Sequence, residues 1–208
     1  TEPAPETFVY DMGQNMVGWV SLKVNGKAGD TVRMRFAEIL NDDDTIYRDN
    51  LRRAEATDTY ILKGGGEEVF EPHFTYHGFR YVEVTGYPGG KPGKDAITGK
   101  VFHTDLKKAG TFESSDPMVN KIVQNTQWGL WGNFMAVPTD CPQRDERLGW
   151  LGDAQCIWET ACYLMDVQSF TEKWARDLRD GQGPRGDFPN VAPRVIADNE
   201  GAPAWGDA

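Results

Sequence analysis

The residues best suited to chemistry fall in one short stretch, residues 139–153, between two apolar segments with helical spacing. Its four carboxylates, two guanidiniums and one indole are Asp140, Asp145, Glu146, Asp153, Arg144, Arg147 and Trp150. A solvated loop with surface ion pairs would also be rich in charge. However, Pro142, Gly149 and Gly152 prevent one long solvated helix, and an indole is costly to leave exposed. The stretch is therefore a candidate functional site.

The crowding of carboxylates has a chemical consequence. Neighbouring negative charges repel, so one carboxyl group can keep its proton to a higher pH than an isolated one. A carboxylic acid that is still protonated near neutral pH can protonate a leaving oxygen, which is what a glycosidase requires of its general acid. The chemistry that these residue types favour is acid-assisted cleavage of a glycosidic bond.

The residues before this stretch predict a β-sandwich domain over residues 1–113. Strand-like runs, in which apolar residues alternate or cluster, cover 17–24, 31–37, 59–62, 79–85 and 97–103. Clusters of Gly, Pro and Asp separate these runs at 41–44, 64–66 and 87–93. Short strands with turn signals at this spacing are typical of a sandwich.

From residue 114 the apolar spacing becomes helical, and residues 114–208 are predicted to begin an all-α domain. Ser115 or Asp116 can cap a helix whose first residue is Pro117, where the missing N–H costs nothing. Because the helices of this segment are too few to close a core, we expect them to be the start of a larger helical domain.

Two further helices are predicted in this domain, over residues 154–165 and from about residue 167 to 180. Asp166 is the predicted cap of the second, and Gly181 ends it. The Gly- and Pro-rich residues 181–206 then form a long loop with little periodicity. Loops of this length in compact domains tend to be functional.

Four stretches of the chain carry a family resemblance. They are residues 10–19 (YDMGQNMVGW), 50–53 (NLRR), 74–82 (FTYHGFRYV) and 140–154 (DCPQRDERLGWLGDA). The last resembles the signature of the bacterial α-L-rhamnosidases of glycoside hydrolase family 78. These are inverting enzymes with an (α/α)6-barrel catalytic domain, and the other three stretches are similar to the sandwich domain that precedes the barrel. The similarity spans nearly the whole chain, which makes it far more specific than a lone short motif.

The resemblance implies a role for each matching position. Glu146 matches the general acid of the family. The side chains that match those holding the rhamnose hydroxyls are Asp140, Arg144 and Asp153, and the indoles that match the walls of the sugar pocket are Trp150 and Trp205. These roles agree with the chemistry, because carboxylates and Arg form charge-assisted hydrogen bonds to vicinal hydroxyls. Indole faces suit the C–H side and the 5-methyl group of a 6-deoxy sugar.

An inverting glycosidase also needs a second carboxylate, roughly 6.5–9.5 Å from the first, to activate water. The resemblance implies that this base is a Glu far downstream, beyond this chain. The other carboxylates considered, none of which matches it, are Asp145, Glu159, Asp187, Glu200 and Asp207. The chain has no initiator Met and both ends look cut. We therefore expect the parent protein to be an enzyme and this 208-residue piece alone to be inactive.

Two alternative functions remain open at this point. The chain could belong to another (α/α)6 glycosidase that acts on a different sugar, because a hydroxymethyl group in place of the methyl changes pocket complementarity. It could also be a non-catalytic carbohydrate-binding sandwich module with a helical appendage. The substrate expected from the resemblance is a rhamnosylated glycoside or polysaccharide.

The composition excludes several other classes. With 39% hydrophobic and 26% charged residues, the chain is typical of a globular protein. A net charge of −10 argues against nucleic-acid binding and disfavours docking on an anionic membrane. No apolar run is long enough to span a bilayer. We expect no cofactor, while the compartment (cytoplasmic, periplasmic or secreted) and the oligomeric state stay open.

The cysteines and histidines do not predict a metal centre. The cysteines are odd in number, lack CxxC spacing and are expected to be buried thiols; they are Cys141, Cys156 and Cys162. The histidines lack a third ligand at suitable spacing and are expected to be structural or at the surface; they are His73, His77 and His103. The acidic residues 41–45 are expected to form a hairpin turn rather than a calcium site.

Overall fold

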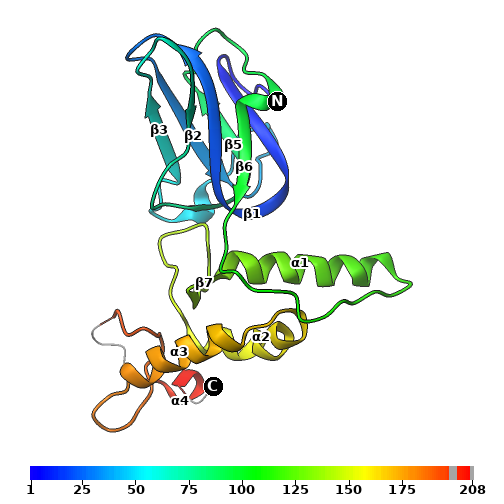
Figure 1. The fold of residues 1–208 in the computed structure, drawn as a ribbon, viewed down its shortest axis with the longest axis vertical. Coiled ribbons are helices and arrows are strands. Elements are labelled where there is room, and N and C mark those ends of the chain that lie inside the picture. The colour runs from blue at the N-terminus through cyan, green and yellow to red at the C-terminus, as the bar shows by residue number, and fades with distance from the viewer. Residues whose placement is uncertain (197–200, 207–208) are drawn as a thin grey trace. The chain divides into compact units, whose positions relative to one another are not determined.

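The computed structural model describes residues 1–196 and 201–206, and the chain divides into two compact units (Figure 1). The first comprises Thr1–Phe102 together with Gln143–Asp145. The second comprises His103–Pro142 and the chain from Glu146 onward. The predicted domain boundary between residues 113 and 114 stays a prediction.

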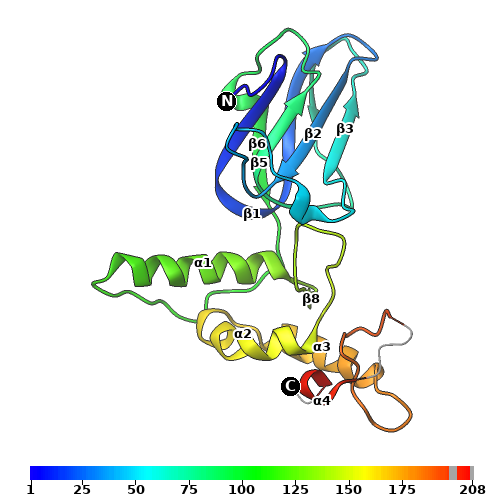
Figure 2. The same cartoon turned by 180° about the vertical axis from the view of Figure 1, so that it is seen from behind.

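The first unit is a curved antiparallel β-structure (Figures 1 and 2). Its strands in the described part of the chain are β1 (Thr7–Gly26), β2 (Thr31–Ala37), β3 (Thr57–Ile61), β4 (Gly66–Phe70), β5 (His77–Thr85) and β6 (Ile97–Val101). Short 3-10 turns at Asp49–Leu51 and Lys94–Ala96 precede β3 and β6. The strand order is β3-β2-β5-β1-β4, and β6 also pairs with β1.

The long strand β1 joins the two parts of this sandwich. Its residues 7–18 pair with β5, residues 18–22 pair with β6, and residues 22–26 pair with β4. At Gly18, where the partner changes, a Cβ atom would lie 1.8 Å from the carbonyl oxygen of Lys100. Only glycine permits this close approach of two backbones.

The inward faces of the strands form the core. The alternation predicted over 31–37 is confirmed, because Val32, Met34 and Phe36 of β2 are fully buried. His77 of β5 lies inside as well, stacked on Phe36 with ring centroids 4.0 Å apart. Its Nε2 lies 3.1 Å from the carboxylate of Asp58, so the structural role expected for this histidine is confirmed.

The second unit contains the helices α1 (Pro117–Asn133), α2 (Leu151–Leu164), α3 (Gln168–Asp180) and α4 (Pro203–Gly206). A tight hairpin of β7 (Phe134–Met135) and β8 (Val137–Pro138) follows α1. Within the described ranges, no helix is long and apolar enough to cross a membrane. The predicted fold class, a β-sandwich followed by helices, is confirmed.

The start of α1 is as predicted. Pro117 is its first residue, and the carboxylate of Asp116 accepts a hydrogen bond from the amide of Met118 at 2.8 Å. The predicted cap of α3 was wrong by one residue, because Val167 occupies the cap position. Asp166 nevertheless accepts a hydrogen bond from the amide of Gln168 at 3.3 Å, so its side chain still contacts the first turn.

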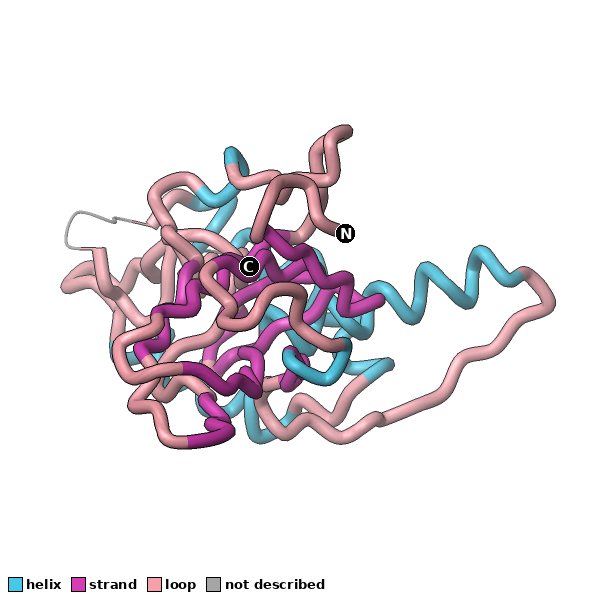
Figure 3. The backbone as a smooth tube through the Cα atoms, turned by 90° about the horizontal axis from the view of Figure 1, so that it is seen from above, coloured by secondary structure: helices cyan, strands magenta, loops and turns pink. Residues whose placement is uncertain are grey.

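Two apolar clusters hold the helical unit together. The first joins the ends of α1 and α2 to α3 and contains Leu106, Leu130, Phe134, Ala161, Met165, Val167 and Phe170. The second contains Leu151, Ala154, Trp174 and Ala192. Figure 3 shows the linker of residues 103–116 as a long loop running out to the first turn of α1. Leu106 anchors this linker in the first cluster.

The cysteine prediction was correct only in part. All three are free thiols, but only Cys141 is buried, and the exposed ones are Cys156 and Cys162. Both exposed cysteines belong to α2. The buried residues that α2 contributes to the two apolar clusters are Leu151, Ala154 and Ala161. Cys156 is two residues after the buried Ala154 and Cys162 is one residue after the buried Ala161, and helical residues one or two apart do not share a face, so both cysteines can point to solvent.

Candidate active site

Residues 140–148 form a closed loop between β8 and α2, here termed the acid loop. The amide of Asp140 donates to the carbonyl oxygen of Leu148 at 3.0 Å, and the amide of Leu148 donates back to Oδ1 of Asp140 at 2.8 Å. Nε of Arg147 donates to the carbonyl oxygen of Pro142 at 3.1 Å, which ties the loop across its middle. These bonds fix both ends of the segment that carries Glu146.

The backbone next to Glu146 is strained. Arg147 has a φ of 55°, in the left-handed region that residues with a Cβ atom rarely adopt. Such a conformation costs on the order of 1–3 kcal/mol and is concentrated at functional sites, where the surrounding structure imposes it. In this loop the two hydrogen bonds between Asp140 and Leu148 impose the turn.

Glu146 is half-buried, and its carboxylate has a defined partner. Nε1 of Trp150 donates a hydrogen bond to Oε1 of Glu146 at 3.2 Å. Trp150 occupies the position just before α2 and has extended backbone angles, φ −71° and ψ 124°. The indole therefore orients the side chain that the sequence predicted to be the general acid.

The second predicted indole, Trp205, lies on α4 beside Trp150. The ring centroids are 5.4 Å apart and the ring planes are inclined by 60°. The Trp205 ring lies directly over Gly152, where a Cβ atom would be 2.2 Å from Cε3. Nε2 of Gln155 also donates to the carbonyl oxygen of Ala204 at 3.2 Å. The absence of a side chain at Gly152 makes room for the Trp205 ring, and the hydrogen bond from Gln155 tethers α4 to α2.

The long segment after α3 contributes to this arrangement, although the predicted loop over residues 181–206 ends in α4 (Pro203–Gly206). Residues 190–192 run alongside residues 149–151, with the amide of Leu151 donating to Asn190 at 3.0 Å. Nε1 of the buried Trp174 on α3 donates to the carbonyl oxygen of Ala192 at 3.0 Å. The backbone on which Trp150 is mounted is thereby fixed from two sides.

Two of the predicted substrate-binding carboxylates line one pocket. Asp140 of the acid loop and Asp153 in the first turn of α2 open onto a hollow of about 320 Å³ between α1 and α2. Its floor is apolar and includes Leu130, Phe134 and Ile157. Asp153 also lies at the N-terminal end of α2, where the helix dipole favours a negative charge.

Asp140, Cys141 and Glu146 lie close together, with their potential ligand atoms all within 4.8 Å of one another. These residues could approach a cation jointly. The sequence did not indicate Cys141 as a site residue. The signal for it was its position inside the fifteen-residue stretch, where it is the buried neighbour of Asp140.

Arg144 and Asp145 belong to Gln143–Asp145, the segment of the acid loop that is part of the sandwich unit. The carboxylate of Asp145 accepts hydrogen bonds from the backbone amide of Arg53 at 3.3 Å and from its Nε at 3.1 Å. Burial alone would raise the pKa of Asp145, but the hydrogen bonds and charge of Arg53 outweigh it and lower that pKa. Asp145 is therefore ionised at neutral pH and is a poor proton donor.

The remaining carboxylates are engaged elsewhere or lie outside the described residues. Glu159 accepts a hydrogen bond from the hydroxyl of Tyr163 at 3.4 Å on the exposed side of α2. Asp187 lies 4.0 Å from Nε of Arg185 within the long loop. Glu200 and Asp207 lie outside the described residues.

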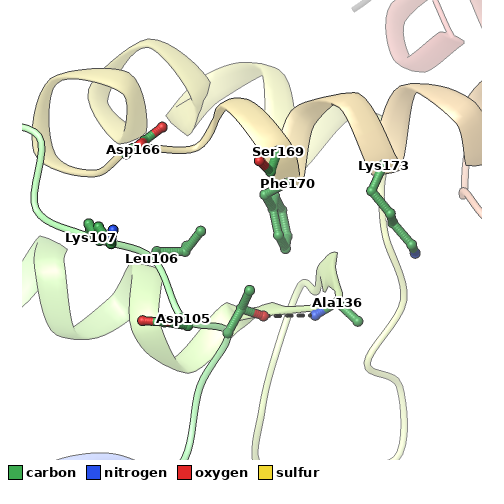
Figure 4. Close-up of a pocket in the computed structure, with 9 residues that line it drawn as sticks. Asp105, Leu106, Lys107, Ala136, Asp166, Ser169, Phe170 and Lys173 are labelled. Carbon is green, nitrogen blue, oxygen red and sulfur yellow. Dashed lines mark hydrogen bonds between the residues drawn. The ribbon is translucent and has the colours of Figure 1, made fainter.

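A second hollow of the helical unit, of about 420 Å³, contains none of the predicted site residues (Figure 4). Phe170 projects from α3 toward Leu106 and Ala136 on the opposite side, and Ser169 and Lys173 flank it on the same helix. The dashed line marks the hydrogen bond from the amide of Ala136 to the hydroxyl of Thr104, 3.1 Å long. Its lining includes the carboxylates of Asp105 and Asp166 but none of the indoles found near Glu146.

Comparison with known proteins identifies the family. Residues 1–103 match the model of the bacterial alpha-L-rhamnosidase concanavalin-like domain, and residues 107–208 match that of the bacterial alpha-L-rhamnosidase 6 hairpin glycosidase domain. A β-sandwich followed by the helices of a glycosidase domain places the chain among the glycoside hydrolases. Within that class, the chain belongs to the bacterial α-L-rhamnosidase family.

Individual relatives agree along the whole chain. The α-L-rhamnosidase of Streptomyces avermitilis is 57% identical over 208 residues, which are 100% of this chain and 20% of that protein. The crystal structure of the Streptomyces avermitilis α-L-rhamnosidase complexed with L-rhamnose superimposes with a TM-score of 0.96 over 100% of this chain and 20% of that one, at 56% identity. The structure of the α-L-rhamnosidase from Dictyoglumus thermophilum superimposes with a TM-score of 0.96 at 47% identity. The match covers 99% of this chain and 23% of that one. The chain thus spans about a fifth of the length of these relatives.

Proposed function

We propose that this chain is the part of an α-L-rhamnosidase that holds the terminal rhamnose and donates the proton to the glycosidic oxygen. The single observation that supports this most is the hydrogen bond from Nε1 of Trp150 to Glu146, inside the motif that matches the family. A carboxyl group fixed by an indole and adjoining a second carboxylate has the properties of a general acid.

Glu146 is the proton donor of this proposal. A ligand atom of Asp140 lies within 4.8 Å of that of Glu146, so both carboxyl groups can approach the same part of a bound substrate. Asp145, the adjacent carboxylate in the sequence, is held ionised by Arg53. Of the two consecutive acids, the contacts therefore favour Glu146 as the one that carries a proton.

The sugar would bind beside this acid. Asp140 and Asp153 share the hollow between α1 and α2, where both can accept hydrogen bonds from vicinal hydroxyls. Arg144 would supply a charged donor to the same ring. Trp150 and Trp205, inclined by 60°, offer two apolar walls for the C–H side and the 5-methyl group.

The base that activates water would come from outside these residues. The carboxyl groups of inverting glycosidases are separated by roughly 6.5–9.5 Å, which leaves room for the attacking water. Asp140, within 4.8 Å of Glu146, is too close to serve as such a base. Inversion therefore requires a carboxylate elsewhere in the enzyme, and the 208-residue chain alone would not hydrolyse rhamnosides.

The test uses the complete product of the gene that contains this sequence, with p-nitrophenyl α-L-rhamnoside as substrate. The matched control is p-nitrophenyl α-L-mannoside, which differs only by a hydroxyl on C6. We expect release of p-nitrophenol from the rhamnoside, strong preference over the mannoside, and β-L-rhamnose as the first product in ¹H NMR. Preference for the mannoside would assign another sugar, α-L-rhamnose as first product would reject inversion, and no release would reject the function.

A further inference from the structure

The contact between Arg53 and Asp145 connects residues 92 positions apart in the sequence, both of them in the sandwich unit. The carboxylate of Asp145 accepts from the backbone amide of Arg53 through Oδ1 and from its Nε through Oδ2. The Arg53 side chain is 93% exposed, whereas that of Asp145 is 25% exposed. The pair is thus an oriented, two-point contact and not a buried ion pair.

The segment that presents Arg53 is well anchored on the sandwich. Leu51, at the end of the 3-10 turn, is 1% exposed, and the amide of Ala54 donates to its carbonyl oxygen at 3.0 Å. Arg52, between them, has a left-handed φ of 54°, so the chain turns sharply before Arg53. The side chain of Asn50 donates to Glu38 at 3.3 Å. A strained, tethered turn that presents one arginine is a rigid mount for its partner.

We propose that Arg53 is a positioning residue that acts through Asp145 on the general acid Glu146. Asp145 is joined to Glu146 by a peptide bond, so two hydrogen bonds on its carboxylate restrict the backbone from which the acid projects. Supporting contacts of this kind hold functional groups within a fraction of an ångström of their productive geometry. This inference rests on the proposed role of Glu146.

The expected effect lies in catalysis and not in stability. An exposed ion pair contributes little to the free energy of unfolding. In contrast, a displacement of about 1 Å at a reacting group can cost up to about 10²-fold in rate. Removal of the Arg53 side chain should leave Glu146 present but less well placed. The catalytic rate should therefore fall, but by less than when Glu146 itself is replaced.

The test compares Arg53→Ala, Arg53→Lys, Asp145→Asn and the double variant R53A/D145N in the complete gene product. Arg33→Ala, at an exposed arginine on β2 of the same unit, is the matched control. Each variant is assayed on p-nitrophenyl α-L-rhamnoside, whose leaving group needs little protonation, and on methyl α-L-rhamnoside, whose leaving group needs it fully. Thermal unfolding is recorded for each variant.

We expect Arg53→Ala to lower kcat on the methyl glycoside by about tenfold, within the limit set by misplacement, and to change the p-nitrophenyl rate much less. Asp145→Asn should have the same effect, the double variant should lose no more, and Arg53→Lys should recover part of the activity. A variant indistinguishable from Arg33→Ala would overturn the inference and leave the proposed function intact. An equal loss on both substrates with a lower unfolding temperature would also overturn it. A wild-type enzyme inactive on both would reject the proposed function and this inference together.

Discussion

The indole of Trp150 donates a hydrogen bond to the carboxylate of Glu146, with 3.2 Å between Nε1 and Oε1. Because Trp150 stands immediately before α2 and its backbone runs beside residues 190–192, this donor is fixed by the fold and not by a flexible stem. The same indole lies 5.4 Å from Trp205, between centroids. One side chain thus orients the proposed acid and forms one wall of the proposed sugar site.

Replacing Trp150 with Phe keeps an aromatic face but removes the N–H donor. Without this donor the carboxyl group of Glu146 is less well positioned, and a displacement of about 1 Å at a reacting group can cost up to about 10²-fold in rate, so we expect kcat on a rhamnoside to fall by about tenfold. Trp128→Phe, on the half-buried side of α1, is the control and should leave kcat unchanged. A Trp150→Phe enzyme with wild-type kcat would show that the hydrogen bond does not orient the acid.

Gly152→Ala tests the contact that positions Trp205. The added Cβ would lie 2.2 Å from Cε3 of the ring, so the indole must move away from Trp150. Since Trp205 is proposed to bind sugar and not to transfer protons, KM should rise several-fold while kcat changes little. Gly93→Ala in the sandwich unit, where a Cβ meets nothing within 4 Å, is the control. Equal KM values for the two variants would remove Trp205 from the proposed site.

Trp174→Phe tests the support of the 190–192 segment. The buried indole donates to the carbonyl oxygen of Ala192 at 3.0 Å, and phenylalanine leaves that oxygen without this donor. An unsatisfied buried group costs about 1–3 kcal/mol, so the urea midpoint should fall correspondingly. The measurement is equilibrium unfolding followed by tryptophan fluorescence and circular dichroism, beside Trp128→Phe. No change relative to that control would mean that the segment is held by its backbone pairing alone.

The sandwich unit should lose stability in acid partly through Asp11. Hydrogen bonds from Arg80, at 2.8 and 2.7 Å, lower the pKa of Asp11 despite the opposing effect of burial. Because the folded pKa lies below the unfolded value of about 3.9, the stabilisation is present above that value and disappears as the pH falls through the folded pKa. Asp11→Asn should therefore destabilise the protein at pH 7, and this effect should diminish as the pH falls through the folded pKa of Asp11. The control is Asp42→Asn, and a pH-independent effect of Asp11→Asn would contradict the assignment.

The sequence predicted those parts of the fold in which pattern and burial agree. Residues 31–37 alternate cleanly and form β2 with the bounds expected. In contrast, β4 was missed because its pattern is inverted. Glu68 points inward and accepts hydrogen bonds from the hydroxyl of Tyr60 and the amide of Gly64, while Val69 is 64% exposed. A carboxylate that is buried because its neighbours satisfy its oxygens breaks the apolar alternation by which a strand is recognised.

The first half of β1 was missed for a different reason. Its pairing with β5 is irregular between Asp11 and Met16, so apolar residues do not recur at period two there. The site shows the same division. The six candidate residues were predicted from their resemblance to a family signature, but the contact of Trp205 with Gly152 and the pairing of Trp150 with Val191 depend on tertiary structure.

The most direct test of the proposal concerns Glu146 itself. In the complete gene product, kcat/KM is measured for wild type and Glu146→Gln on methyl and 2,4-dinitrophenyl α-L-rhamnosides. A general acid contributes about 10²–10⁴-fold, so the variant should lose that factor on the methyl glycoside and little on the dinitrophenyl glycoside, whose leaving group needs no proton. An equal loss on both substrates, or none on either, would contradict the assignment of Glu146 as the proton donor.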